Sequence, residues 1–404
     1  MTMSEFLPEL LERAIALPAA RPLIARLQDG SPVWLVGGAV RDLLLGGAPV
    51  DLDLVVEDDA GALATALGGD VRVHDRFGTS TVRLDGFTYD IARTRRETYA
   101  HPGALPDVEP APLAEDLLRR DFTVNAIALA LAGGELTAVP GALDDLDARQ
   151  LRVLHDESFI DDPTRLFRLV RYATRFGFEI EPHTRSLADA AISGGALGTV
   201  SGPRVGAELR LLAREPDPVR ALRGLHELAL DTAIHPGFGL GDEELARRAL
   251  ALLPEDGGGD RLALAVAARG VPAPELTALL HSLGFDAEDR DAIVIAASGA
   301  EDAARGLAAA RAPSEIAAAI GGAPPELVAL AGALGAEPQA RRWLDQLRHV
   351  RLEIDGRDLL AAGVPEGPAI GRGLRAALAA KLDRRASGRE QELAEALRAA
   401  GGRR

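Results

Sequence analysis

The sequence predicts a mixed α/β N-terminal part followed by a longer all-α part. Two patterns predict this division: strand-like and helix-like stretches alternate over about the first 130 residues, and strand signals nearly vanish from Asp161 onwards. Aromatic residues make up only 4% of the chain, which suits helical domains rich in Ala and Leu better than an all-β core. A length of 404 residues suggests two to four domains.

The N-terminal elements follow from hydrophobic periodicity. Residues 1 to about 28 have the spacing of one amphipathic helix, with Leu10 and Ile15 on the same side. An apolar run then predicts a strand, and the pattern "AVRDLLLG" predicts a helix that stops at a Gly pair. Alternating patterns predict a further strand and a pair of strands separated by turns. These stretches are the run 33–36, the helix 39–46, the strand 50–56 and the strand pair within 71–93.

The remaining chain divides into one long loop and a series of helices. Residues 100–114 contain four prolines and a glycine, so we expect a loop there. Beyond residue 161, helical patterns are separated by breaks such as "REPDP", "LPEDGGGD", "GVPAPE" and "GGAPPE". The C-terminal half is therefore expected to be an α-helical assembly.

Charge and cysteine content narrow the possible classes of protein. The formal net charge is −16, which by itself argues against a nucleic-acid binder unless the arginines gather on one face. The absence of cysteine excludes a disulfide scaffold, Cys-ligated zinc and a thiol nucleophile. No secretory signal pattern or long uncharged apolar run is present, so we expect no membrane span and a cytoplasmic location.

Two aspartates alternate with leucines on one predicted strand. Asp51 and Asp53 are two residues apart, so both side chains should point to the same face. Neighbouring carboxylates repel each other, and they persist where a divalent cation lies between them. Mg²⁺ suits such a site, because it binds through one or two carboxylates together with substrate phosphates. The alternative is an exposed strand with two solvated aspartates.

A Gly pair lies at the start of the helix that precedes this strand. Gly37 and Gly38 lack side chains, so the backbone can approach a triphosphate at the N-terminus of that helix. Arg41 on its first turn is placed to hold the phosphates, although a surface ion pair with Asp42 would also explain it. Asp90 is the candidate third carboxylate, with the capping of a turn at a strand end as an equal alternative. These features together describe a nucleotidyl-transfer site.

Several segments resemble one family. "LVGGAVRDLLLGGAPVDLDLVV" resembles the nucleotide-binding motif of the class II tRNA nucleotidyltransferase and bacterial poly(A) polymerase family, which belongs to the polymerase-β-like superfamily. Further resemblances follow in the family's order: "HDRFGTSTV", "EDLLRRDFTVNAIA", "DDPTRLFRLVRYATRFGFE" and "VSGPRVGAEL". Together they span about residues 30 to 215, and residues 352–383 resemble the family's tail more weakly.

The resemblance implies an architecture and an activity. The expected parts are an α/β nucleotidyltransferase head at 1–150, a helical neck with the base-recognition helix at 151–215, a helical body at 216–335 and an RNA-binding helical tail at 336–404. The implied reaction is untemplated addition of C and A residues to the tRNA 3′ end from CTP and ATP with Mg²⁺. A-only, CC-only and poly(A) addition stay open, as does a non-catalytic RNA-binding scaffold.

The resemblance also assigns roles to further residues. Ribose recognition falls to Arg120, Asp121 and Asn125. Base selection falls to Asp162 and Arg165, with support from Arg168 and Arg171. The family usually has a glutamate where this chain has Asp161, which is not the base reader, so we expect the change to be mild.

The chemistry of an Asp–Arg pair explains a preference for C and A. Asp162 and Arg165 are expected side by side at i and i+3 on a helix. Aspartate only accepts hydrogen bonds and arginine only donates them. Cytosine and adenine offer an amino donor beside a ring-nitrogen acceptor, whereas uracil and guanine offer the reverse order. Four arginines follow at helical spacing, and their mutual repulsion indicates a polyanionic ligand. They are Arg165, Arg168, Arg171 and Arg175.

Overall fold

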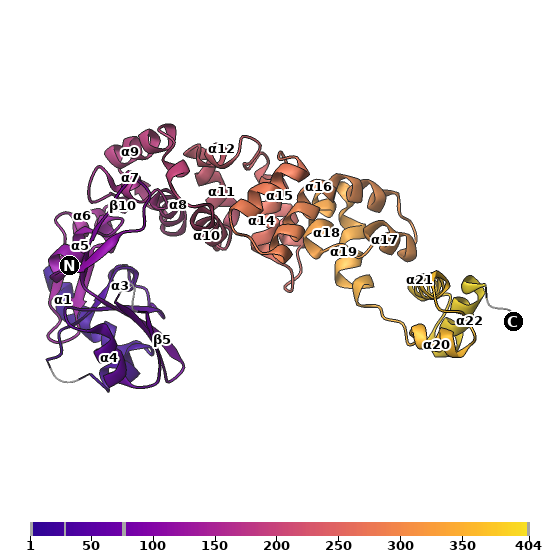
Figure 1. Ribbon diagram of the computed structural model, residues 1–404, viewed down its shortest axis with the longest axis horizontal. Helices are drawn as coiled ribbons and strands as arrows, with labels where there is room; N and C mark the ends of the chain where they lie inside the picture. Colours follow the sequence, from indigo (N-terminus) through magenta and orange to yellow (C-terminus); the bar gives the residue numbers. More distant parts are fainter. Residues whose placement is uncertain (1–2, 28–29, 75–77, 402–404) are drawn as a thin grey trace. The chain divides into compact units, whose positions relative to one another are not determined.

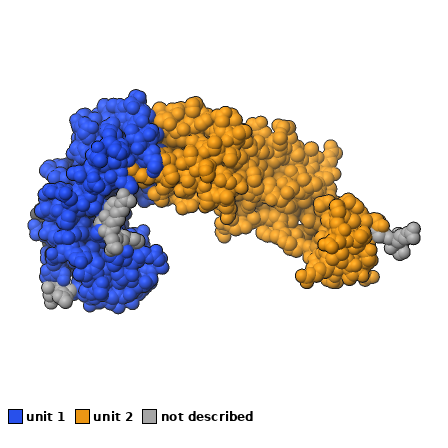
Figure 2. Space-filling model, in the orientation of Figure 1, with its two compact units in different colours: residues 1–201 blue, residues 202–404 orange. Residues whose placement is uncertain are grey.

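The computed structural model describes residues 3–27, 30–74 and 78–401, which form two compact units (Figure 2). The first unit comprises residues 1–201 and the second residues 202–404. The stretch 75–77 of the "HDRFGTSTV" segment lies outside the described residues. The expected division at 150, 215 and 335 stays a prediction.

A seven-stranded mixed sheet organises the first unit. Its strands are β1 (Val33–Val36), β2 (Leu52–Val56), β3 (Asp70–His74), β4 (Thr79–Leu84), β5 (Phe87–Arg93), β8 (Ile127–Ala130) and β9 (Leu136–Ala138). Their order is β3-β4-β5-β2-β1-β8-β9, and only β2 and β5 pair in parallel. The register places Asp53 opposite Asp90, and Asp90 opposite Thr81. The sheet therefore brings two candidate carboxylates onto adjacent strands.

Six α-helices among the described residues of 3–147 accompany this sheet. They are α1 (Met3–Ala16), α2 (Ala20–Ile24), α3 (Gly38–Leu44), α4 (Ala60–Leu67), α5 (Leu113–Leu118) and α6 (Ala142–Asp147). Helix α4 contacts β3, β4 and β5, and α3 contacts β1, β2 and β8; Figure 1 labels both helices. Leu35 and Leu54 of the sheet and Leu43 of α3 are almost fully buried. This packing fixes α3, and with it the Gly-Gly turn, against the strand that follows Asp51.

The prediction of one helix over residues 1 to 28 was wrong. Helix α1 ends at Ala16 and α2 begins at Ala20, with Pro18 in the break. Proline has no N–H to donate and disfavours helical geometry in the residue before it, so the helix cannot continue. Leu10 is buried, but Ile15 is 38% exposed. Within the break, the Ala19 carbonyl accepts a hydrogen bond from the Tyr89 hydroxyl at 2.6 Å.

The expected loop at 100–114 is partly wrong as well. Strand β7 (Asp107–Pro110) pairs with β6 (Arg95–Thr98) as an antiparallel hairpin, and α5 begins at Leu113. The tip of this hairpin is anchored, because the Gly103 N–H donates to the Ile160 carbonyl at 3.1 Å. Gly103 has a φ of +68°, and a Cβ there would lie 2.3 Å from the Thr199 hydroxyl oxygen. Only glycine permits this close approach.

A group of helices completes the first unit. It contains α7 (Ser158–Asp161), α8 (Arg165–Phe176) and α9 (Pro182–Ser193), with a two-residue parallel pair between β10 (Gln150–Leu151) and β11 (Glu179–Ile180). One face of α8 is buried through Leu166, Phe167, Leu169 and Val170. Its other face carries the arginine series.

The second unit is all-α over its described residues 202–401, which confirms the expected helical assembly (Figure 1). Its longer helices are α10 (Gly202–Ala213), α11 (Pro218–Glu227), α13 (Glu243–Leu252), α14 (Gly259–Ala267), α15 (Ala273–Ser282), α16 (Ala287–Ala309), α17 (Pro313–Ile320), α18 (Pro325–Ala331), α19 (Glu337–Asp345), α21 (Pro368–Leu382) and α22 (Gly388–Ala400). Shorter helices are α12 (Leu230–Ile234) and α20 (Gly356–Ala361). Helices α20, α21 and α22 share a small core around Leu359, Ala377 and Ala396.

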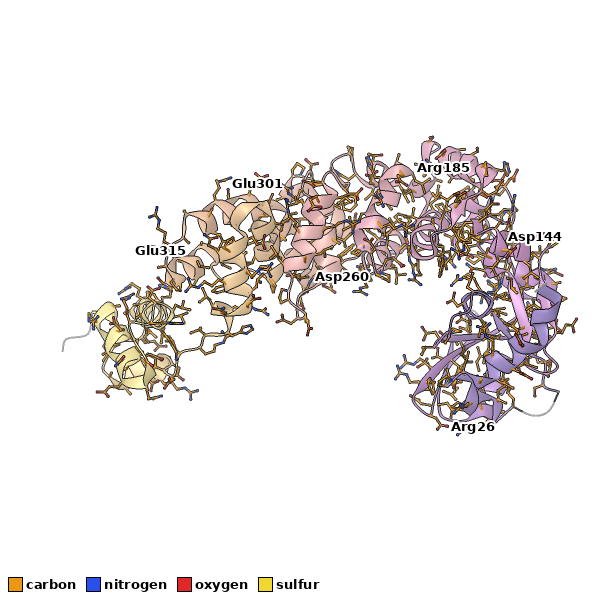
Figure 3. The ribbon with its side chains drawn as sticks, turned by 180° about the vertical axis from the view of Figure 1, so that it is seen from behind. Arg26, Asp144, Arg185, Asp260, Glu301 and Glu315 are labelled. Atoms are coloured by element: carbon orange, nitrogen blue, oxygen red, sulfur yellow. The ribbon has the colours of Figure 1, made fainter. Side chains whose placement is uncertain are left out.

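Acidic side chains lie on the outside of the second unit. Glu301 on α16 is 70% exposed, and Glu315 on α17 is also exposed; Figure 3 labels both. No single helix in the described parts of the chain has the length and apolarity to cross a membrane, and one sharply bent helix pair at 313–349 passes only by length and composition.

Candidate active site

A cavity of about 590 Å³ in the first unit collects most of the predicted site residues. Every predicted residue except Asp90 lines it: Gly37, Gly38, Arg41, Asp51, Asp53, Arg120, Asp121, Asn125, Asp162, Arg165, Arg168 and Arg171. Asp90 lines a neighbouring cavity of about 420 Å³. Asp53 and Arg120 border both cavities, so Asp53 stands at their junction.

The three carboxylates lie on β2 and β5 or immediately next to them. Asp51 directly precedes β2 and Asp53 is its second residue, and both are exposed. Asp90 lies in the middle of β5, so capping of a turn at the strand end does not explain it. Its Oδ1 accepts a hydrogen bond from the Thr81 hydroxyl at 2.7 Å.

The carboxylates crowd one another electrostatically. The pKa of Asp53 is raised, first by the protein that surrounds its concave site and then by the charges of Asp90 and Asp51, while Arg120 opposes the shift. The Asp53 side chain still reaches solvent, so its desolvation is incomplete. We therefore attribute the raised pKa mainly to repulsion by the charges of Asp90 and Asp51. A divalent cation between Asp51 and Asp53 would relieve this repulsion, so the donor set fits Mg²⁺. Among residues 3–27, 30–74 and 78–401, no group of three or more potential ligands could hold a metal by itself.

The Gly-Gly turn has a backbone that only glycine tolerates easily. Gly37 has φ +65° and ψ −129°, and its N–H donates to the Ile127 carbonyl at 3.1 Å. A Cβ on Gly37 would lie 3.0 Å from Nη1 of Arg120. The missing side chain therefore makes room for an arginine of the cavity wall as well as for any ligand.

Arg41 is a buried link between elements. Its Nε donates to Asp42 at 2.9 Å and its Nη1 to the Asn125 side-chain oxygen at 2.6 Å. The guanidinium also stacks 4.0 Å from the centre of the Phe176 ring, and the residue is only 4% exposed. The predicted alternative of a pair with Asp42 is present, but Arg41 is buried in it while the Asp42 side chain is 35% exposed. Arg41 thus joins α3 to α8.

The residues expected to read the sugar form a continuous polar network. The Asn125 side-chain nitrogen donates to Asp121 at 2.9 Å, and Arg168 forms an ion pair with Asp121 at 2.7 Å. Burial by itself would raise the pKa of Asp121, but Arg168 and Asn125 lower it below its ordinary value. Arg120 points its Nη2 at Asp116, at 3.0 Å, and its buried Nε has no hydrogen-bond partner among the described residues.

The expected placement of Asp162 on the base-recognition helix was wrong. Helix α8 begins at Arg165, and Asp162 has φ −134° and ψ 90° in the turn before it. Pro163 explains this, since a residue before proline is pushed out of helical geometry. Asp162 instead accepts hydrogen bonds from Thr164, at 3.1 Å from its N–H and 2.6 Å from its hydroxyl. Asp162 and Arg165 nevertheless line the same cavity.

Positive charge is concentrated on the cavity wall. Eight arginines line it against six carboxylates, although the whole chain has a formal net charge of −16. All four members of the predicted arginine series belong to this wall. The negative net charge of the whole chain therefore does not describe the cavity. The excess of arginines over carboxylates in its wall suits an anionic ligand.

Two buried carboxylates that sequence reasoning missed hold the arginines of the wall in place. Asp116, whose side chain is fully buried, accepts from Arg119 at 2.8 Å and from Arg120 at 3.0 Å. Glu97 accepts from Arg95 and from Arg119, each at 2.9 Å. An acidic residue between arginine and tyrosine in "RRETY" and the acidic pair in "AEDLLRR" were the available signals.

Tyr99 is a further missed residue of the cavity wall. Its hydroxyl donates to Glu97 at 3.1 Å. Burial first, and then the charges of Glu97 and Asp162, raise the pKa of Tyr99 to about 12, against an opposing effect of Arg165. The tyrosine therefore stays neutral and keeps its hydrogen for Glu97. This contact lies within the β6–β7 hairpin, and Tyr99 lines the same cavity as Asp162 and Arg165.

The sheet, the carboxylates and the arginine-lined cavity define a nucleotidyltransferase head. Residues 33–152 match the family model described as the poly A polymerase head domain. Over 392 residues the chain is 37% identical to the CC-adding tRNA nucleotidyltransferase of Deinococcus radiodurans, covering 89% of this chain and 91% of that protein. The chain belongs to the class II tRNA nucleotidyltransferase family.

Two further comparisons describe the range of its relatives. The A-adding tRNA nucleotidyltransferase of Geobacter sulfurreducens is 42% identical over 251 residues, which are 58% of this chain but only 28% of that protein. The solved structure of the Thermotoga maritima CCA-adding enzyme complexed with tRNA is similar with a TM-score of 0.75 and 26% identity, covering 97% of this chain and 98% of that one.

Proposed function

We propose that this chain adds C, C and A to the 3′ end of tRNA from CTP and ATP, without a nucleic-acid template. The observation that carries the proposal is a single cavity lined by Asp51 and Asp53, the Gly37–Gly38 turn, and the Asp162–Arg165 pair. One base-reading pair can serve both nucleotides, because cytosine and adenine present the same order of donor and acceptor to it.

The proposed reaction is attack of the RNA 3′ hydroxyl on the α-phosphorus of the nucleotide. The new O–P bond forms as the bond to pyrophosphate breaks, and the hydroxyl proton passes to Asp90, which Thr81 orients. The triphosphate lies against the N-terminus of α3, where the first N–H groups lack partners within the helix. Arg120 lies over the Gly37 backbone, and its unpartnered Nε suits an oxygen of the nucleotide.

Mg²⁺ is the cofactor that the two carboxylates fit. Asp51 and Asp53 would hold it, and when bound it neutralises triphosphate charge and makes the attacking hydroxyl more acidic. Asp121, Asn125 and Arg120 orient the ribose beside it. The network from Asp121 through Asn125 to Arg41 keeps these groups in fixed positions.

Base selection in this proposal depends on desolvated polar groups. Arg165 donates to the ring nitrogen of cytosine or adenine, and Asp162 accepts from the amino group beside it. Arg168 and Arg171 add positive charge along the same helix face. Uracil or guanine would leave these groups without partners, and sites built on hydrogen bonds reject such analogues by factors of about 10⁴ or more.

Addition of CC alone is the second candidate. It is favoured by the Deinococcus radiodurans relative, which is matched over nearly its whole length and is named as CC-adding. Addition of A alone has support from the higher identity to the A-adding relative, but over a smaller part of this chain. Poly(A) addition and a non-catalytic RNA-binding scaffold are outcomes of the same tests.

Incubation with labelled CTP or ATP distinguishes these outputs. The substrates are tRNA lacking CCA, tRNA ending in CC, and an unrelated RNA. We expect C, C and A on the first, A on the second and nothing on the third. C and C alone on the first would make the chain CC-adding, and long A tracts on the third would make it a poly(A) polymerase. No incorporation on any of them would overturn the proposal.

A pair of variants tests the role of the carboxylates. Asp51→Ala should abolish incorporation while tRNA binding, measured by filter retention, is largely kept. Asp70→Asn is the control, because Asp70 is an exposed strand carboxylate outside both cavities. Undiminished incorporation by Asp51→Ala would rule out the assigned metal site.

A further inference from the structure

We propose that Ser158 is a positioning residue for base selection, because it fixes Arg165 and Asp162 relative to each other. The inference rests on the proposed function and deepens it. Ser158 is the first residue of α7 and its side chain is fully buried, so it cannot reach a nucleotide itself. Any effect of Ser158 on base selection must therefore pass through residues that it contacts.

Ser158 contacts both members of the proposed base-reading pair. Its hydroxyl oxygen accepts a hydrogen bond from Nη1 of Arg165 at 2.7 Å. Its backbone carbonyl accepts from the Asp162 N–H at 3.3 Å. One buried residue thus sets the distance between the guanidinium and the turn that carries the carboxylate.

Arg165 is restrained from a second side. Its Nη2 donates to the Arg119 carbonyl at 2.8 Å, and the residue is only 4% exposed. Arg119 is itself held through its side chain by Asp116 and Glu97. With two donors attached to fixed acceptors, the guanidinium plane has one orientation toward the cavity.

That orientation matters because uracil presents its donor and acceptor in the reverse order along the same edge. For cytosine the carboxylate accepts from N4 and the guanidinium donates to N3. For uracil the same two groups could accept from N3–H and donate to O4 only if the guanidinium and the carboxylate exchanged places along that edge. Holding Arg165 against Ser158 opposes this movement, so the serine hydroxyl contributes to rejection of uracil without touching it.

The test compares nucleotide preference in Ser158→Ala with that of the wild type. A hydrogen bond to a charged group is worth a factor of roughly 10 to 100 in an equilibrium constant. We expect the CTP-over-UTP ratio of kcat/KM on tRNA lacking CCA to fall by roughly that factor. The ratio of CTP and UTP dissociation constants, measured by calorimetry without RNA, should fall in the same direction. Ser158→Cys, which keeps the size but weakens the acceptor, should lie between the two proteins.

Thr184→Val is the matched control. Thr184 on α9 is also fully buried, and its hydroxyl bonds to Glu181 and to the Val153 N–H outside the cavity. Thr184→Val should lose thermal stability but keep the CTP-over-UTP ratio of the wild type. A Ser158→Ala protein that also loses stability and keeps the ratio would overturn the inference. A wild type that neither binds nor incorporates CTP in preference to UTP would overturn the proposed function itself, and the inference with it.

Discussion

Replacing each glycine of the Gly37–Gly38 turn by alanine should give opposite effects on stability. Gly37 has φ +65° and ψ −129°, a combination that costs an ordinary residue about 1 to 3 kcal/mol. Its new Cβ would also lie 3.0 Å from Nη1 of Arg120, so this guanidinium must move. Gly38 begins α3, and its Cβ would meet nothing nearer than Nη2 of Arg41 at 3.4 Å.

The expected values follow from these two environments. Gly37→Ala should lower the free energy of unfolding of the first unit by about 1 to 3 kcal/mol, because the backbone strain persists in the folded state. Gly38→Ala should leave it unchanged or raise it by up to about 1 kcal/mol, since alanine favours a helix over glycine. A loss of activity in Gly38→Ala would therefore report close approach of a ligand to the backbone rather than misfolding.

The chain offers a suitable fluorescent probe for this measurement. It has two tryptophans, Trp34 on β1 and Trp343 on α19, so a Trp343→Phe background leaves a probe three residues before Gly37. Urea unfolding of the three proteins in this background then follows the first unit alone. Equal midpoints for the wild type and Gly37→Ala, with equal slopes, would refute the argument from backbone strain.

Two further predictions concern charged groups. The fold raises the pKa of Asp53, so it disfavours the charged form of this carboxylate. The free energy of unfolding therefore falls as pH rises from the ordinary aspartate pKa through the raised pKa of the folded state. Asp53→Asn should therefore melt at a higher temperature than the wild type at pH 7 in metal-free buffer while losing activity; a lower melting temperature would contradict the assigned crowding. Asp116 has a lowered pKa despite its burial, because Arg119 and Arg120 favour its charged form. The stabilisation that Asp116 gives the fold is therefore present above the ordinary aspartate pKa and is lost as pH falls through the lowered pKa of the folded state. Asp116→Asn should lower the free energy of unfolding by about 3 to 5 kcal/mol at pH 7 in the same urea assay. Glu109→Gln is the control, because it removes an exposed partner of Arg96 and should change that free energy little. Equal effects of the two variants would contradict the role of burial.

Local patterns predicted which residues gather around one cavity better than they predicted the backbone around them. The Gly pair after an apolar run gave the turn at its correct position, because a turn depends on neighbours in sequence. The alternation around Asp53 gave the strand but not its start, since β2 begins at Leu52 and Asp51 precedes it. The pairing of Asp53 with Asp90 depends on a parallel contact between strands far apart in sequence, and only their placement in one sheet shows it. The error at Asp162 came from reading helical spacing through a proline, although Pro163 was visible in the sequence.

The sequence predicted arginines in the cavity wall, but it did not predict the buried carboxylates that pair with them. A series of arginines at helical spacing indicates an anionic ligand, but it does not show how like charges are kept together when no ligand is bound. In this fold Asp121 pairs with Arg168 of that series. Asp116 on α5 and Glu97 on the β6–β7 hairpin pair with Arg119, which belongs to another part of the same wall. They also leave guanidinium groups facing the cavity in fixed positions. Such acidic partners follow no sequence pattern, because an acidic residue on any neighbouring element can fill the role. Only the tertiary structure therefore identifies them.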